Sequence, residues 1–353
     1  MIGKRDVRDI VIEIGILTLG DYASDPRTGS VITEQQRILE IIEAAKLADE
    51  LGLDVFGVGE SHQEHFVSQA HTVILGAIAA STKQIKLTSS ATIISTSDPV
   101  RVYEDFSTID LISNGRAEII AGRASRIGLF ELLGYDINDY EEFFDEKFDL
   151  LLKLNKEQPL RWAGLFRPPL KDAVLYPKPK KGSLPIWRAV GGAPYSAVAA
   201  GKQGVPMMLA NLAGPVSLFK HSVDAYKKYY KAYGHDESNM KIGITNLFYV
   251  HDSKEVAFET YFVYLNQGFL HSNGNPMNKE AYVNALDIEN VLMVGDVDTI
   301  VAKILHQYDA YGHDRVMFQV DLGGMLFSEV KRNIEVIGKE IMSRVKKEIN
   351  SKR

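Results

Sequence analysis

The sequence contains no cysteine among its 353 residues. This absence excludes disulfides, thiolate metal sites, cysteine nucleophiles and iron–sulfur clusters. No stretch approaches the roughly 18 consecutive apolar residues that a membrane-spanning helix needs, and residues 1–10 lack the apolar run of a signal peptide. We therefore expect a cytoplasmic protein with no membrane partner.

Positive charge is also scarce, since 40 Lys and Arg face 46 Asp and Glu and leave a net charge of −6. We expect no nucleic-acid partner, because such proteins usually carry a basic surface. No Gly-Lys pair is followed by Ser or Thr, so there is no phosphate loop. The glycine pattern of a dinucleotide-binding site starts at Gly57 but is incomplete, because His62 occupies the position of its third glycine. The nucleophile elbow of hydrolases and the H-E-x-x-H zinc helix are also absent.

The rest of the composition is that of a globular chain, 45% hydrophobic and 24% charged. The length fits roughly two domains, or one barrel of about 250 residues with insertions. Short β-branched runs alternate with longer stretches of helical periodicity. They predict strands at residues 10–17, 55–58, 85–94, 116–121, 185–190, 206–210, 241–250 and 315–320. Such alternation implies parallel strands and right-handed crossovers. We predict an α/β fold, a closed (β/α)8 TIM barrel with insertions, with an open doubly wound sheet as the alternative.

Two segments interrupt this alternation. Residues 157–184 contain five prolines and several lysines, and we interpret them as a Pro-rich insertion or extended arm. A second insertion is predicted at about residues 266–290, where residues 271–277 are rich in Asn and Gly and predict a polar loop. The prediction is a single domain over residues 1–353 that carries both insertions.

Polar residues follow the second and third predicted strands, which in a barrel end at the catalytic mouth. Glu60 and His62 follow the second strand and can serve as a general acid and base. With His65 they also allow a metal site, and a solvated polar loop is the plain alternative. Ser90 and Ala91 lie at the end of the third strand, where their small side chains let a flat ligand approach the backbone, although close strand packing by itself explains them.

Two further segments fit an anion. Arg123 and Ser125 follow the fourth strand beside Gly122, where the guanidinium and the hydroxyl suit a phosphate. Residues 191–196 follow the fifth strand and open a helix, whose free N–H groups favour an anion. A surface salt bridge and a simple tight turn are the respective alternatives. Because the two segments come from adjacent barrel units, together they can hold one phosphate.

In their order and spacing, these motifs resemble the bacterial luciferase-like, flavin-dependent monooxygenase family. The resemblance covers about residues 13–344 and rests on the segments 60–62, 89–91, 98–101, 109–116, 121–123 and 190–193. The stretches 122–136 and 319–324 are similar to an oxidoreductase subgroup of that family.

The resemblance implies a TIM barrel with a flavin lying across its C-terminal mouth. His62 and Glu60 are the catalytic residues that it implies, with no metal. Ser90 and Ala91 would lie against the flavin ring, through a non-prolyl cis peptide bond. The residues that it implies for the phosphate of flavin mononucleotide (FMN) are Arg123, Ser125, Gly191, Gly192, Ala193 and Ser196.

One residue departs from the luciferases, whose Glu-His-His motif is here Glu60-Ser61-His62. Because serine is a poor base, we do not expect light emission. The resemblance implies a two-component monooxygenase that uses molecular oxygen and reduced FMN, delivered by a separate flavin reductase, on a small-molecule substrate of unknown identity. A deazaflavin-dependent hydride-transfer enzyme and a non-catalytic flavin-binding protein are the alternatives. It also implies a homodimer, and the apolar stretch 73–80 is consistent with an interface.

Overall fold

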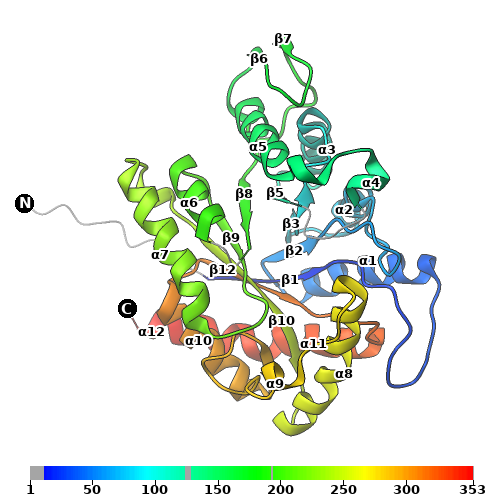
Figure 1. Cartoon of the computed structure of the whole chain (residues 1–353). Helices are drawn as coiled ribbons and strands as arrows, with labels where there is room; N and C mark the ends of the chain where they lie inside the picture. Colours follow the sequence, from blue (N-terminus) through cyan, green and yellow to red (C-terminus); the bar gives the residue numbers. More distant parts are fainter. Residues whose placement is uncertain (1–11, 124–128, 192–193, 353) are drawn as a thin grey trace, which may run out of the picture.

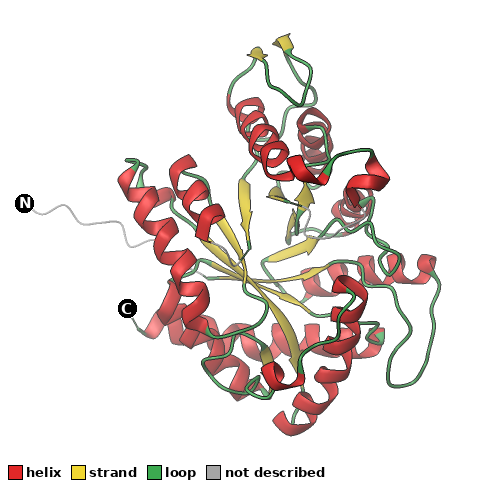
Figure 2. Cartoon of the chain, in the orientation of Figure 1, coloured by secondary structure: helices red, strands yellow, loops and turns green. Residues whose placement is uncertain are grey.

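In the computed structural model, which describes residues 12–123, 129–191 and 194–352, the chain folds into a barrel of parallel strands ringed by helices (Figures 1 and 2). The strands follow one another around the barrel in the order β1, β2, β3, β5, β8, β9, β10 and β12. Pairing of β9 with β10 and of β12 with β1 closes the ring. The predicted (β/α)8 barrel is therefore confirmed, and the open sheet is excluded.

All eight barrel strands lie where the sequence predicts them, with ends that differ by a few residues. Their bounds are β1 Glu13–Thr18, β2 Val55–Val58, β3 Lys86–Ser89, β5 Ala117–Gly122, β8 Ile186–Val190, β9 Met207–Ala210, β10 Ile242–Val250 and β12 Arg315–Gln319. Two short strands extend the sheet, β4 Thr92–Ile93 beside β5 and β11 Met293–Gly295 beside β10.

Helices connect successive strands and pack on the outside of the barrel. Their bounds are α1 Glu34–Glu50, α2 His71–Ser81, α3 Pro99–Ile112, α4 Leu129–Leu133, α5 Tyr140–Lys156, α6 Pro194–Gln203, α7 Val216–Ala232, α8 Lys254–Asn273, α9 Lys279–Tyr282, α10 Val297–Tyr311, α11 Phe327–Val336 and α12 Met342–Ser351. A π-helical turn, Ile337–Ile341, joins the last two. Thr33 caps α1 and Asp98 caps α3, each through its side-chain oxygen.

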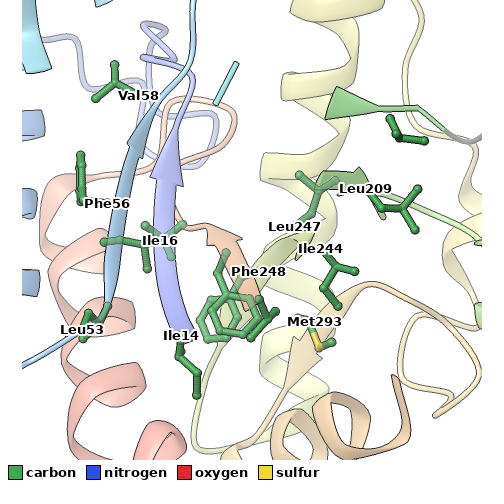
Figure 3. Close-up of a cluster of buried hydrophobic side chains, with 14 of the residues drawn as sticks. Ile14, Ile16, Leu53, Phe56, Val58, Leu209, Ile244, Leu247, Phe248 and Met293 are labelled. Carbon is green, nitrogen blue, oxygen red and sulfur yellow. The ribbon is translucent and has the colours of Figure 1, made fainter. Parts of the chain in front are cut away.

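The barrel has an inner and an outer apolar layer. Side chains from six different strands meet inside it: Leu17, Val55, Ile120, Trp187, Met208 and Met317. The alternate residues of each strand point outward and pack against the helices, as Figure 3 shows for Ile14 and Ile16 of β1 and for Phe56 and Val58 of β2. This alternation follows from the two-residue period of a strand.

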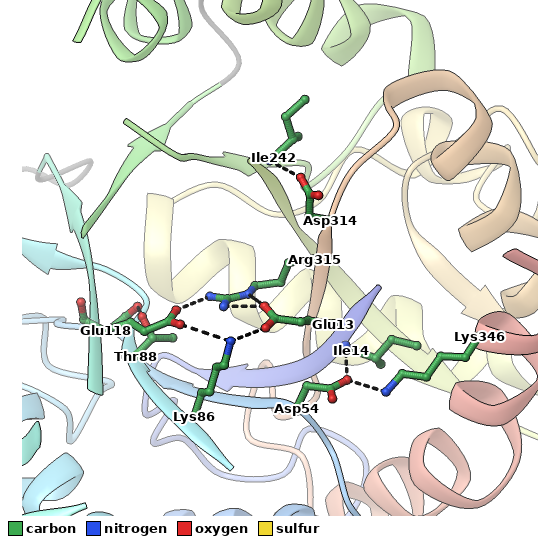
Figure 4. Close-up of polar contacts among 11 residues, drawn as sticks. Glu13, Ile14, Asp54, Lys86, Thr88, Glu118, Ile242, Asp314, Arg315 and Lys346 are labelled. Carbon is green, nitrogen blue, oxygen red and sulfur yellow. Dashed lines mark hydrogen bonds and ion pairs between the residues drawn. The ribbon is translucent and has the colours of Figure 1, made fainter. Parts of the chain in front are cut away.

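Charged side chains close the N-terminal end of the barrel (Figure 4). Arg315 donates to Glu13 Oε2 at 2.7 Å and to Glu118 Oε2 at 2.7 Å. Lys86 pairs with both of these carboxylates. Burial alone would raise the pKa of Glu13, but Arg315 and Lys86 outweigh it and hold that pKa below its usual value. The four residues form a compensated ionic layer at the face that barrels use for stability.

The two predicted insertions take different forms. The Pro-rich segment contains an antiparallel hairpin, β6 Leu160–Trp162 with β7 Leu170–Ala173, which projects beside α5 in Figure 1. The predicted polar loop at residues 271–277 is partly wrong, because α8 continues to Asn273 and is capped by Gly274 in the left-handed conformation. Tertiary contacts sustain these extra turns, since Gln267 donates to the carbonyl oxygens of Ser24 and Gly323. Within the described residues, no helix is long and apolar enough to cross a membrane.

Candidate flavin site

A cavity of about 910 Å³, including the space open to solvent, lies at the C-terminal ends of the barrel strands. Five of the residues that the sequence singles out line it together: Glu60, His62, Ser90, Ala91 and Arg123. They meet because each follows a parallel strand, and the carboxyl ends of these strands share one face of the barrel.

Glu60 and His62 form a hydrogen-bonded pair at this cavity. The His62 Nε2 atom lies 2.9 Å from Glu60 Oε1, and the other carboxylate oxygen accepts the Ile93 N–H at 2.7 Å. Because a carboxylate only accepts, His62 Nε2 must carry a hydrogen. Glu60 therefore fixes the orientation of the imidazole, and in the neutral ring Nδ1 is the atom that can accept a proton.

A second histidine, which the sequence analysis missed, lies behind this pair. The Nδ1 atom of His71 is 3.8 Å from Glu60 Oε2, and its Nε2 atom is 2.8 Å from the Thr92 hydroxyl oxygen. Burial lowers the pKa of His71, although the Glu60 carboxylate opposes this shift. His71 therefore contributes a neutral, buried support to Glu60. The sequence did not predict a role for His71 because it begins an apolar helix, where a histidine is usually a structural core residue.

The Ser90–Ala91 peptide bond is cis, as the resemblance implies. Two glycines let the neighbouring strands approach this segment. A Cβ atom on Gly59 would lie 2.4 Å from the Ser90 carbonyl oxygen, and one on Gly122 would lie 2.8 Å from Ala91 Cβ. Both distances are too short for a real side chain. The half-buried Ser90–Ala91 segment is thus closely packed against its neighbours in the cavity wall.

Arg123 is the cation that reaches the cavity from β5. Its Nη1 atom donates to Glu141 Oε1 at 2.9 Å, and its guanidinium lies over the rings of Tyr140 and Phe144. Behind it, Arg188 is fully buried and donates to Asp145 Oδ1 at 2.8 Å. Burial lowers the pKa of Arg188, and Asp145 partly offsets that shift. Two arginines and two carboxylates thus stand together beside the cavity.

The remaining predicted phosphate residues differ in their placement. Gly191 follows β8, the parallel neighbour of β5, so it lies at the same edge as Arg123. A Cβ atom added to Gly191 would meet no other atom within 4 Å. Ser196 is fully buried, and its hydroxyl oxygen is 3.3 Å from Arg188 Nε and 3.4 Å from the Ala189 carbonyl oxygen. Its hydroxyl group is therefore used within the protein, away from the cavity. The three other predicted residues, Ser125, Gly192 and Ala193, lie outside the described residues.

Ser61 and Gln63, which flank His62, also line the cavity. Its other lining residues were not predicted, and most of them are apolar: Leu17, Leu19, Ile93, Leu129, Ala210, Leu212, Thr245, Asn246 and Gln319. Gln319 has a fixed orientation, because its Nε2 atom donates to Asp21 Oδ2 at 3.2 Å. Apart from strand ends, no local pattern marks these positions, since they converge only when the barrel closes.

His65 contacts another histidine ring and is not part of a cluster of metal ligands among the described residues. Its ring stacks on that of His271 at the end of α8, with centroids 3.9 Å apart. Among the residues that the structure describes, no group of three or more His, Asp or Glu is placed to hold a metal ion. The metal-dependent alternative therefore has no geometric support in this part of the chain.

Comparison with known proteins identifies the family. The sequence profile described as luciferase-like monooxygenase matches residues 12–315. The chain belongs to the luciferase-like monooxygenase family. It is 25% identical to N-acetyl-S-alkylcysteine monooxygenase of Bacillus subtilis over 276 residues, which cover 75% of this chain and 78% of that protein.

Two solved structures share the fold of this family member. The FMN complex of the oxygenating constituent of 3,6-diketocamphane monooxygenase from Pseudomonas putida superposes with a TM-score of 0.74 at 17% identity, over 95% of this chain and 99% of that one. The coenzyme F420-dependent tetrahydromethanopterin reductase of Methanopyrus kandleri gives 0.73 at 18% identity, with the same coverage. The fold is thus shared by proteins that use flavin and deazaflavin cofactors.

Proposed function

We propose that this protein is a monooxygenase that binds reduced FMN, delivered by a separate reductase, and oxidises a small uncharged organic molecule. The observation that carries the proposal is the combination of Arg123 and the closely packed Ser90–Ala91 segment in one cavity, with the Glu60–His62 pair beside them. A flavin phosphate fits the guanidinium, and a flat ring fits the small side chains. FMN therefore matches both ends of the site.

Each residue has a defined role in this proposal. Arg123 and the N–H groups near Gly191 bind the phosphate, while Ser90 and Ala91 support the ring. Bound reduced flavin would supply the electrons that activate molecular oxygen. Glu60 holds the His62 ring with Nε2 protonated, which leaves Nδ1 to take or hold a proton at the reacting end. Apolar wall residues such as Leu17, Leu19 and Leu212 exclude water.

The cavity lining supports an uncharged substrate. Glu60 is committed to His62, and Arg123 stands at the proposed phosphate end. The polar groups that remain along the wall include the neutral side chains of Thr245 and Gln319. A charged substrate would lose its hydration there without gaining a free counter-charge among the described lining residues.

Deazaflavin-dependent hydride transfer is the second candidate, because F420-dependent proteins share the fold. The surface beside Arg123 favours FMN instead. The deazaflavin cofactor F420 continues beyond its phosphate into a chain of glutamates. The first turn of helix α5 carries Glu142 in addition to Glu141, the partner of Arg123, and so adds negative charge beside the arginine. Like charges would repel such a tail.

An anaerobic titration tests the proposed cofactor. Purified protein is titrated with reduced FMN, reduced riboflavin and reduced F420, and the dissociation constants are compared. We expect FMN to bind most tightly, because riboflavin lacks the phosphate and F420 carries the acidic tail. Preference for F420 would support hydride transfer, and failure to bind any of the three would contradict a flavin enzyme.

We also propose a homodimer that forms through α2. One face of this helix is buried against the barrel through Ile74, Leu75 and Ile78. The opposite face exposes small apolar residues, with Val73 71% exposed and Ala77 exposed one turn later. Small residues let two helices approach closely. Light scattering is expected to give twice the 39.3 kDa chain mass for the protein, and the monomer mass for Ala77→Arg.

A further inference from the structure

The Arg123–Glu141 ion pair stands where the proposed flavin phosphate would bind. Arg123 is mostly buried, with 19% of its side chain exposed, whereas Glu141 is 49% exposed in the first turn of α5. The hydroxyl group of Tyr140 donates to the same Glu141 oxygen at 3.1 Å. Two donors, the Arg123 guanidinium and the Tyr140 hydroxyl group, therefore hold the Glu141 carboxylate in place. The carboxylate nevertheless remains half exposed to water.

The other arginine of the cluster offers no substitute for Arg123. Arg188 is fully buried, and its three guanidinium nitrogens lie near Ser196, Gln203 and Asp145. Its charge is balanced by Asp145, one helical turn beyond Glu141. With both ion pairs formed, the cluster has no net positive charge to offer an anion. A phosphate must either displace Glu141 or bind close to its negative charge.

We propose that Glu141 competes with the flavin phosphate for Arg123 and so keeps the bound flavin exchangeable. This inference rests on the proposed function, because it assigns the phosphate to Arg123. Because the Glu141 carboxylate is half exposed, water can replace much of what it gains from Arg123, so a dianion can displace it. The same weakness lets Glu141 return and speed flavin release.

Exchange is a requirement of the proposed chemistry. An enzyme that receives reduced flavin from a separate reductase must bind the cofactor and release it again in each cycle. A fully available arginine would hold the phosphate more tightly and slow its release. A carboxylate in the same cluster lowers the affinity without removing the recognition of phosphate.

The test compares Glu141→Gln with the matched control Glu142→Gln. Both residues lie in the first turn of α5 and both changes remove one negative charge, but only Glu141 contacts Arg123 in the structure. Dissociation constants and release rates are measured anaerobically for reduced FMN and reduced riboflavin. The Glu141 carboxylate and a phosphate that carries nearly two negative charges would repel each other at short range. We expect Glu141→Gln to bind FMN about tenfold more tightly, mainly through slower release, with riboflavin binding unchanged.

Each outcome decides a different point. Equal FMN affinity in the wild type and both variants overturns the competition, as does weaker binding by Glu141→Gln, which would make Glu141 a support for Arg123. Equal tightening in both variants would indicate a general charge effect and also overturns it. If neither flavin binds any of the three proteins, the proposed function fails. Inorganic phosphate is then titrated against thermal stability, and tighter binding by Glu141→Gln alone would still support the competition.

Discussion

Replacing Arg123 with alanine tests the assignment of the phosphate end of the cavity. The guanidinium is the charged donor that reaches the cavity from β5, and it is already shared with Glu141. A hydrogen bond to a charged group contributes about 1.5–3 kcal/mol, and the loss of the pair with the half-exposed Glu141 offsets about 0.5 kcal/mol. The net loss of roughly 1–2.5 kcal/mol corresponds to FMN binding about 5- to 70-fold weaker.

The measurement is the ratio of the dissociation constants of reduced FMN and reduced riboflavin. Riboflavin carries no phosphate, so its affinity should stay constant in Arg123→Ala while that of FMN falls. Arg101→Ala is the control, because Arg101 is 72% exposed and pairs with Glu104 on α3. An unchanged ratio in Arg123→Ala would refute the reasoning, and equal weakening of both flavins would place Arg123 beside the ring instead.

Three further predictions concern catalysis and stability. His62→Ala is expected to slow the oxidation of bound reduced flavin by oxygen about 100-fold in stopped flow, with FMN affinity within threefold, because it removes the acid–base group; an unchanged rate would contradict that role. Arg315→Met leaves Lys86 as the counter-charge shared by Glu13 and the buried Glu118, and should cost about 3–5 kcal/mol in urea unfolding. Arg344→Met, at an exposed pair, should cost less than about 1 kcal/mol. Burial lowers the pKa of His313 to about 3 from 6.5. Between these pH values the unfolded chain binds a proton that the folded chain excludes, so stability should fall as the pH falls, by up to about 1.4 kcal/mol per pH unit. His313→Leu should flatten this dependence, and an equal slope in both proteins would show that other groups cause it.

Local sequence patterns were sufficient for the barrel. The second strand, Val55–Val58, is a short apolar run that ends at a glycine, and its bounds coincide with the prediction. Helix α1 begins after Thr33 because the side chain of this residue satisfies a free N–H group. Glu60, His62 and Arg123 could be assigned to one site because parallel strands end on one face of a barrel.

Positions that depend on distant partners could not be predicted. Arg188 lies within a strand, and its burial depends on an ion pair with Asp145. No local sequence pattern around Arg188 predicts this distant partner. Gln319 gains its orientation from Asp21, 298 residues earlier in the chain. The end of α8 was missed for the same reason, since its Asn and Gly content favours a loop and only contacts with distant segments extend the helix.

The two ends of the barrel show how the surroundings decide what an arginine does. Arg315 is 1% exposed, is held by two carboxylates and stacks on Trp187 at 4.5 Å, so no part of its guanidinium remains for a ligand. Arg123 faces a cavity and has one half-exposed carboxylate partner. Removing a partner from Arg315 therefore strands a buried charge and destabilises the fold, whereas removing the partner of Arg123 frees a cation for an incoming anion. We expect lower stability in Glu118→Gln and tighter FMN binding in Glu141→Gln. These opposite responses to the same kind of substitution would distinguish the structural arginine, Arg315, from the ligand-binding one, Arg123.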